Sequence, residues 1–128
     1  MKPYDEQTEL TTYVWNHYSR FCTPAESKAN WAHISDTYAR AGRTQFANFF
    51  RQDHKIDEDP AAMALLSDGT DVFRHRTAQR ILRDHASEIF INRCPRCVRI
   101  VRTPKAQQCL SCGHDWHPLA CLPELPIP

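Results

Sequence analysis

Glycine is scarce in this chain, with only three glycines among 128 residues. The glycine-rich loop that holds phosphates in P-loop proteins, G-x-x-x-x-G-K-[ST], does not occur, and neither does the G-x-S-x-G turn of serine hydrolases. The H-E-x-x-H helix of metalloproteases and the H-x-E that precedes the cysteines of zinc deaminases are also missing. Since no catalytic motif is visible, the sequence favours a protein that is not an enzyme.

Long apolar runs are absent as well. No stretch reaches the roughly 18 consecutive apolar residues that suggest a transmembrane helix. The polar start, from Met1 to Gln7, lacks the apolar run of a signal peptide. These features predict a cytoplasmic protein with no membrane partner. Because the cytosol is reducing, the six cysteines are better interpreted as metal ligands than as disulfides.

The composition is that of a folded, soluble chain. Apolar residues make up 41% of it, aromatic residues 10% and charged residues 24%, enough for a modest core with a helix-rich body. Residues 1–90 carry 11 Lys and Arg against 13 Asp and Glu, whereas residues 91–128 carry 5 against 2. The formal net charge of +1 therefore combines a mildly acidic body with a basic C-terminal part.

The first two-thirds of the chain shows the pattern of four to five helices. From Asp5 to Phe21, apolar spacing of i, i+4, i+7 and i+11 defines one helix face that we expect to pack inward. This face comprises Leu10, Val14, His17 and Phe21. Thr23, Pro24 and Glu26 form a capping box with a proline, so a second helix is expected to begin there and end at Gly42. The side chains that this helix is expected to bury are Trp31, Ile34 and Tyr38.

Three further segments complete the predicted helical body. Phe46, Phe49 and Phe50 form a short apolar cluster at helical spacing, and an acidic connector follows from Asp53 to Asp59. Asp59 and Pro60 repeat the cap-then-proline signal, which predicts a short helix that ends near Gly69. The last helix, over about residues 71–88, is predicted to have an apolar side and a separate basic stripe. The apolar side comprises Ala78, Ile81, Leu82, Ala86 and Ile89, and the stripe comprises Arg76, Arg80 and Arg83.

The pattern changes after residue 89. Two short β-type runs, Phe90–Asn92 and Val98–Arg102, flank a first pair of cysteines, and Val98 and Ile100 are expected on one side of the second run. Prolines recur in the last ten residues, which favours an extended tail. The predicted organisation is a helical domain over residues 1–89, a small β module over residues 90–118 and a proline-rich tail over residues 119–128.

Two C-x2-C pairs carry the strongest chemical signal. Cys94 and Cys97 form the first pair, Cys109 and Cys112 form the second, and eleven residues separate the pairs. One tight turn of this spacing brings two sulfur atoms to the same ion, and zinc prefers four tetrahedral thiolate or imidazole ligands. The four cysteines therefore predict one Zn2+ ion, which would be structural because four protein ligands leave no position for a catalytic water.

Residues 90–117 resemble the zinc-ribbon family. In that family each turn reads C-x2-C, and the second is often followed by glycine and an aromatic residue, as in Cys112-Gly113-His114-Asp115-Trp116. The resemblance implies a four-cysteine ribbon hairpin appended to the helices, so the expected fold class is mainly α with a small β zinc ribbon. The organisation of the whole chain resembles that of small bacterial proteins, a likeness that implies no activity.

Other roles of the cysteines and histidines stay open. A redox dithiol is one alternative, although the βαβ context of C-x-x-C oxidoreductases is missing. Mixed ligation through His114 or His117 is another, with a histidine spacing tighter than that of zinc fingers. Cys22 is interpreted as a small buried apolar residue and Cys121, in the tail, as an incidental thiol.

The cations around the first cysteine pair are the best clue to function. They are Arg93, Arg96, Arg99, Arg102 and Lys105. Four thiolates with one Zn2+ leave a net charge of −2, so part of this set of cations offsets the charge of the metal site. The remaining cations are suited to bind the phosphates of a nucleic-acid backbone, and Trp116 could stack on a base. The arginine stripe of the last helix would extend this surface if that helix packs against the ribbon.

A protein partner is the competing interpretation. The sequence pI of about 7.7 lies below the value above about 9 that is typical of strongly basic nucleic-acid-binding domains. Arginine and tryptophan are also favoured at protein interfaces. The same residues therefore fit a protein-interaction or regulatory module in which the zinc ribbon is structural or part of the interface.

Overall fold

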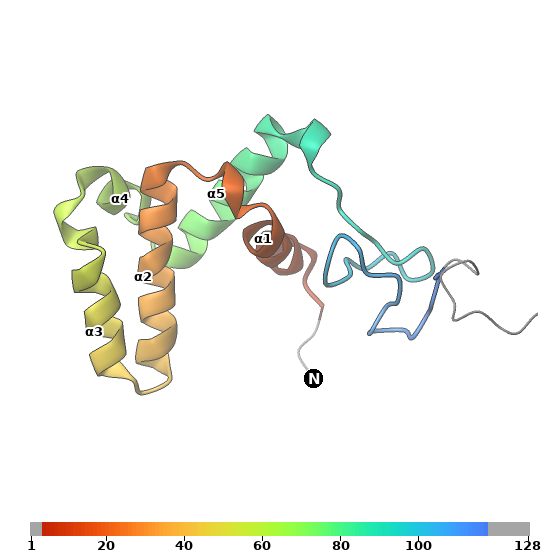
Figure 1. Ribbon diagram of the computed structural model, residues 1–128, viewed down its shortest axis with the longest axis horizontal. Coiled ribbons are helices and arrows are strands. Elements are labelled where there is room, and N and C mark those ends of the chain that lie inside the picture. Colours follow the sequence, from red (N-terminus) through yellow and green to blue (C-terminus); the bar gives the residue numbers. More distant parts are fainter. Residues whose placement is uncertain (1–3, 118–128) are drawn as a thin grey trace, which may run out of the picture.

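A computed structural model describes residues 4–117, which contain five α-helices. In chain order these are α1 (Glu6–His17), α2 (Pro24–Arg40), α3 (Thr44–Asp53), α4 (Pro60–Leu65) and α5 (Thr70–Asp84). Short 3-10 turns follow α1 at Ser19–Phe21, α3 at Ile56–Glu58 and α5 at Ala86–Glu88. The helices lie at one side of the molecule, and the chain after α5 forms a loop-rich module at the other side (Figure 1). The predicted mainly helical architecture is confirmed.

Local capping signals position the helix starts. Asp5 caps α1 by accepting a hydrogen bond from an amide of the first turn at 3.0 Å. At α2, Thr23 Oγ1 accepts from the Glu26 amide, and the Glu26 carboxylate accepts from the Thr23 amide. This is the expected capping box. Asp59 caps α4 through two first-turn amides. The predicted starts of α2 and α4 are therefore correct.

Two clusters of buried side chains form the core of the helical body. The first lies between α1 and α5 and comprises Tyr13, Val14, Tyr18, Ala78 and Ile81. The second comprises Trp15, Ala29, Ala62 and Phe73. On the face predicted for the first helix, Val14 is fully buried, and Leu10 and Phe21 pack at the edge of the core. No helix within residues 4–117 combines the length and apolar character needed to cross a membrane.

The burial predicted for α2 is wrong in detail. The three side chains expected inside, Trp31, Ile34 and Tyr38, are only half-buried. The residues that α2 buries are Glu26, Ala29, Ala32 and Ser35. Small residues are buried here because α3 packs closely against α2: the Ser35 hydroxyl donates a hydrogen bond to the carbonyl oxygen of Ala47 at 2.7 Å. The distance between packed helices depends on the side chains at the contact, and a large side chain here would force α2 and α3 apart.

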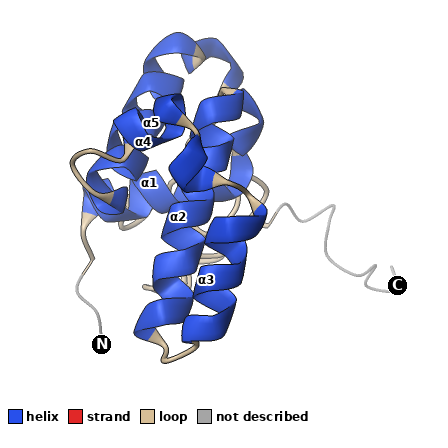
Figure 2. Cartoon of the chain, turned by 90° about the vertical axis from the view of Figure 1, so that its left-hand side faces the viewer, coloured by secondary structure: helices blue, strands red, loops and turns tan. Residues whose placement is uncertain are grey.

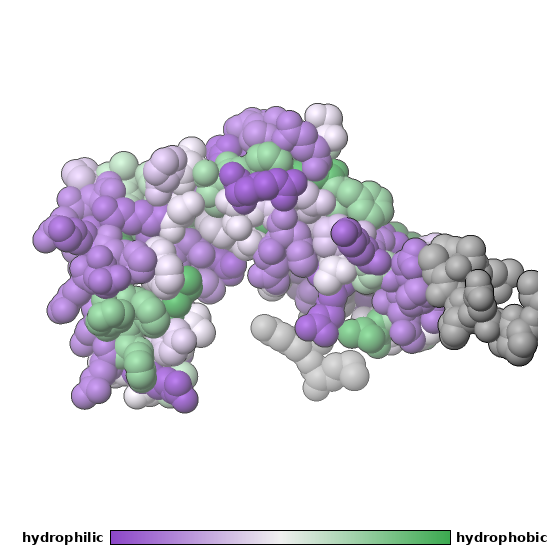
Figure 3. Space-filling view, in the orientation of Figure 1, coloured by the Kyte–Doolittle hydropathy of each residue, from purple (hydrophilic) through white to green (hydrophobic). Residues whose placement is uncertain are grey.

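The α2–α3 hairpin has an aromatic outer face. Ala47 is the one buried residue of α3, whereas Phe46 and Phe49 are 53% and 58% exposed. Phe50 is half-buried and stacks on Trp31 of α2, with 5.5 Å between the ring centroids. Figure 3 shows an apolar patch, in green, on this hairpin. The acidic connector after α3 also holds a fully buried residue, Ile56, which the sequence pattern does not reveal.

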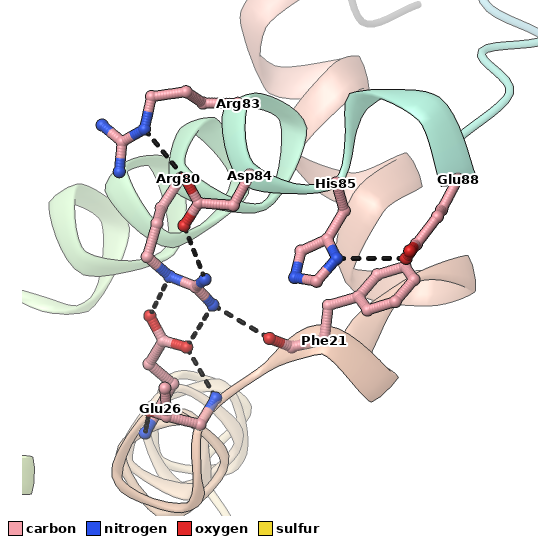
Figure 4. A network of polar contacts seen from close by, with 8 residues as sticks. Phe21, Glu26, Arg80, Arg83, Asp84, His85 and Glu88 are labelled. Atoms are coloured by element: carbon pink, nitrogen blue, oxygen red, sulfur yellow. Dashed lines mark hydrogen bonds and ion pairs between the residues drawn. The ribbon is translucent and has the colours of Figure 1, made fainter.

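The basic stripe predicted for the last helix is neutralised by carboxylates. Arg80 makes the most contacts: it donates to Glu26 of α2 at 2.6 and 2.9 Å and to the Phe21 carbonyl at 3.0 Å (Figure 4). The ion pairs of the stripe are Arg76–Asp68, Arg80–Glu26, Arg80–Asp84 and Arg83–Asp84. The expectation that these arginines extend a basic surface is therefore wrong, because each is already paired within the helical body.

The two β-type runs predicted after residue 89 do not form strands. Within residues 4–117 the backbone makes only isolated antiparallel bridges, between Arg93 and Ile100 and between Gln108 and Asp115. Figure 1 shows the module as loops, and no strand is visible among the described residues in the view of Figure 2. Val98, expected on the same side as Ile100, is 61% exposed and has a φ of +67°, which no β-strand residue adopts. The predicted continuous hairpin is thus absent from the described residues. The predicted tail lies outside them.

Candidate metal centre

Four sulfur atoms converge in the module after α5. The Sγ atoms of Cys94 and Cys112 are 3.6 Å apart, as are those of Cys97 and Cys109, and all four lie within 4.8 Å of one another. A tetrahedral ion with bonds of about 2.3 Å to sulfur holds its ligands about 3.8 Å apart. The cluster therefore has the size and the donor set of a four-thiolate metal site, and it is the one such group in residues 4–117.

The two cysteine turns share one backbone structure. The amides of Cys94 and Cys109 each donate to the carbonyl oxygen five residues further on, at 2.9 and 2.8 Å. The residues that follow the second cysteines, Val98 and Gly113, both donate to the carbonyl of the first cysteine at 2.8 Å. Both have a positive φ, of +67° and +79°. The module is thus built from two equivalent turns, and an antiparallel bridge closes each of them.

Backbone amides point at the sulfur atoms of the first cysteines. The amides of Arg96 and Cys97 both lie 3.4 Å from Cys94 Sγ, and the corresponding amides of the second turn donate to Cys109. Burial alone would raise the pKa of Cys94, but these hydrogen bonds lower it to about 6. The same balance of burial against amide hydrogen bonds lowers the pKa of Cys109. The turns therefore favour the thiolate, the form that binds metal, at the first cysteine of each pair. At Cys97 the hydrogen bond from the Arg99 amide is outweighed by burial and by hydrogen bonds with the other cysteines, which raise the pKa of this thiol.

Small and aromatic side chains pack around the sulfur cluster. Cys94 and Cys109 are 1% and 2% exposed and contact buried Val101, and Trp116 is half-buried against the same cluster. The two histidines weighed as ligands lie elsewhere: His114 stacks on Trp116 at 5.7 Å between ring centroids, and His117 bonds to Asp115. Neither histidine belongs to the metal-sized cluster, so mixed ligation finds no support in this geometry.

Hydrogen bonds attach the module to α1 and the turn that follows it. The hydroxyls of Tyr13 and Tyr18 donate to the Phe90 carbonyl at 2.7 and 3.2 Å. Arg93 donates to the Glu6 carboxylate at 3.0 Å, and this bond lowers the pKa of Glu6 to about 2. Arg93, expected on the binding surface, therefore serves as an anchor between the module and the helical body.

The other four cations of the predicted surface stand free of carboxylates. Arg96, Arg99, Arg102 and Lys105 are exposed and make no ion pair with any residue in the range 4–117. The guanidinium of Arg99 lies over the ring of Tyr4, 5.0 Å from its centroid. A groove of about 600 Å3 runs between the module and the N-terminal part of the chain, and its charged lining comprises Arg99 and Arg102 from the module and Glu9 from α1. The module therefore presents two arginines, unpaired within the described residues, at the wall of a groove whose lining also includes apolar side chains such as Ile100 and Leu110.

Comparisons of the chain with family models, with curated proteins and with solved structures give no match. The resemblance to zinc ribbons consequently depends on residues 90–117 alone. Because a fold does not determine an activity, the function must be argued from the site itself.

Cys22 lies outside the sulfur cluster. Cys22 is half-buried between the two core clusters, where burial raises its pKa to about 11. It behaves as a small apolar residue, as predicted, although it is not fully buried. Cys121 lies outside the described residues.

Replacement of Val98 by glycine should strengthen metal binding. A β-branched residue in the left-handed region carries about 1–3 kcal/mol of strain, which glycine relieves. Since metal binding is coupled to folding of such a module, Val98→Gly should raise the metal affinity by roughly tenfold, measured by competition with a chelator, because about 1.4 kcal/mol corresponds to that factor.

The second turn provides a matched control. Gly113→Val introduces the opposite change at the equivalent position, where an added Cβ has no atom within 4 Å, so only the backbone conformation is affected. This variant should lose metal affinity. If both variants bind metal as tightly as the native chain, the two turns do not control the site.

Proposed function

We propose that this is a non-enzymatic binding protein whose four clustered cysteines, Cys94, Cys97, Cys109 and Cys112, hold one structural Zn2+ in a module of zinc-ribbon type. The proposal is supported by the sulfur spacing and by the amides directed at Cys94 and Cys109. Zinc suits this donor set because it binds four thiolates tetrahedrally. Four protein ligands leave no position for water or substrate, so the role of the ion would be to fold the module.

Contact with a nucleic-acid backbone is the function that fits this geometry best. The observation that carries it is the pair of exposed arginines, Arg99 and Arg102, in the groove beside the module: Glu9 also lines this groove, but no carboxylate within residues 4–117 forms an ion pair with either arginine. Arg96 and Lys105 add two more exposed cations, against a net charge of −2 for four thiolates and Zn2+. Exposed cations bind phosphates chiefly by releasing condensed counterions, without reading base sequence. The proposed ligand is therefore nucleic acid of mixed sequence.

The dependence of affinity on salt tests this function. Binding of a fluorescent mixed-sequence oligonucleotide should weaken steeply as salt rises, and Arg99→Ala with Arg102→Ala should reduce the slope of log affinity against log salt by about 2. Arg76→Ala is the matched control, because Arg76 is exposed but paired with Asp68 on the helical body. Salt-insensitive binding, or no binding at about 50 mM salt, would contradict the proposal.

A protein-interaction function is the second candidate, and the aromatic face of the α2–α3 hairpin favours it. Exposed apolar patches of this kind often mark interaction sites. We infer that the occupant is a second copy of the chain, because α3 carries opposite exposed charges at its two ends, Arg43 before its first residue and Asp53 as its last. In an antiparallel, two-fold pairing of α3 helices, Arg43 of each copy would lie beside Asp53 of the other.

Light scattering tests the self-association. The native chain should form a dimer of the 14.9 kDa protomer, and Phe49→Glu should convert it to a monomer by placing charge in the interface. Phe90→Glu is the matched control, since Phe90 is equally exposed, at 58%, but lies outside the hairpin. A native monomer at high protein concentration would overturn this candidate and leave nucleic-acid binding untouched.

A further inference from the structure

A second, separate cleft lies within the helical body. It has a volume of about 520 Å3 and lies between α1, α2 and α5, where the surface is hollowed beside the hairpin (Figure 3). Its lining includes Thr11, His33, Arg40, Asp71, Arg74 and His75. It shares no residue with the groove beside the cysteine module. The cleft therefore needs an explanation of its own.

Arg74 is the unusual residue of this cleft. Its guanidinium lies over the ring of Trp15, 5.1 Å from the centroid, and the Trp15 indole donates to the Arg74 carbonyl at 3.0 Å. The Nε atom is buried without a hydrogen-bond partner, and the side chain makes no ion pair in the range 4–117. Burial lowers the pKa of Arg74, but an arginine remains charged in proteins. A buried Nε–H group without an acceptor is unfavourable, and an acceptor that enters the cleft would satisfy it.

The neighbours of Arg74 are further donors. Arg40 is exposed at the end of α2 and makes no ion pair within the described part of the chain. Burial and the charge of Arg74 lower the pKa of His33, so its neutral ring can donate one hydrogen bond. The His75 ring lies 3.3 Å from the Thr11 hydroxyl, which fixes both at the wall of the cleft.

The carboxylates at the cleft do not satisfy Arg74. Asp5 is used as the cap of α1 and accepts from the amide and the hydroxyl of Thr8. Asp71 lies one turn before Arg74 on α5, where it is exposed and makes no hydrogen bond to that guanidinium. Neither carboxylate therefore supplies the acceptor that Arg74 Nε lacks.

We propose that this cleft binds an oxyanion, a phosphate or carboxylate group of a small molecule, with Arg74 as its main ligand and Arg40 and His33 beside it. The planar fork of a guanidinium matches two oxygens of either group. The stack on Trp15 holds the fork in place, so little side-chain freedom is lost when the anion binds. This site is independent of the proposed nucleic-acid groove and of the metal.

Nuclear magnetic resonance of the arginine side chains tests the site in the intact, metal-loaded protein. Inorganic phosphate and acetate are titrated separately at constant ionic strength, and the Nε–Hε signal of Arg74 is followed after assignment with Arg74→Gln. We expect a saturable shift of this signal with at least one of the two anions. Saturation by phosphate alone would identify a phosphate-bearing ligand, and saturation by both would extend the ligand class to carboxylates.

Two variants make the result decisive. Arg40→Gln leaves Arg74 and its stack on Trp15 intact and should weaken the binding of the anion by several-fold. This variant keeps the test valid even if Arg74→Gln unfolds. Arg76→Gln is the control on the same helix, and it should change nothing because Arg76 faces Asp68. A linear, non-saturating shift with both anions, or equal shifts of all arginine signals, would overturn the proposal.

Discussion

Cys94→Ser is expected to abolish metal binding and to unfold residues 90–117 while most of the helical signal persists. Metal binding supplies about 10–16 kcal/mol in small zinc modules, more than any other interaction available to a segment with no strand and few buried side chains in its described part. The buried residues of the two core clusters all come from the helical body, and neither cluster contains a metal ligand, while Ile91 and Ile100 of the module pack only at the edge of the first. Metal content per chain, far-ultraviolet circular dichroism and limited proteolysis after residue 89 measure the three effects.

The design of this experiment includes a matched cysteine. Cys22→Ser removes a thiol from the helical core, outside the sulfur cluster, so metal content should stay unchanged. Cys109→Ser should reproduce the effect of Cys94→Ser, because the two residues occupy equivalent places in the two turns. Loss of all helical signal in Cys94→Ser would contradict a helical body that folds independently of the metal.

Arg80→Met is expected to destabilise the helical body by about 3–5 kcal/mol, the usual cost of breaking a buried ion pair. Glu26 is only 5% exposed and holds Arg80 through two hydrogen bonds, which raise the pKa of Arg80 (Figure 4). Removing the guanidinium leaves a buried carboxylate with no cation beside it, held within residues 4–117 only by the Thr23 amide. Urea denaturation followed by circular dichroism gives the free energy of unfolding.

An exposed arginine of the same helix is the control. Arg76→Met breaks a solvent-exposed pair with Asp68 and should change the free energy of unfolding by less than about 1 kcal/mol. The double variant Glu26→Leu with Arg80→Met should lose less than the sum of the single variants, since neither charge is then left unpaired. Equal effects of Arg80→Met and Arg76→Met would show that the buried pair has no special role.

Helix starts could be predicted because their causes are local. Thr23, Glu26 and Asp59 cap helices through atoms within three residues, so the sequence alone contains the geometry. The partners of the arginine stripe could not be predicted in this way. Glu26 and Arg80 come from helices that meet only in the folded protein, and helical spacing reveals which side chains share a face but not which carboxylate lies opposite.

The C-x2-C spacing correctly predicted that the four cysteines cluster, but it did not predict the backbone around them. Val98 and Ile100 have strand propensity, yet the turn that carries Cys94 requires a positive φ at Val98 and overrides that preference. The sequence pattern also did not predict that the α2–α3 hairpin has an exposed aromatic face. Periodicity identified Phe46, Phe49 and Phe50 as one cluster, whereas the helix packs through small Ala47 and leaves the larger rings outside.

X-ray absorption at the metal edge, on protein purified without added zinc, tests the central claim most directly. One zinc per chain with a single shell of four sulfur atoms at about 2.3 Å is the predicted result. Protein that carries no metal, or a zinc shell that includes nitrogen from His114 or His117, would contradict the four-cysteine site.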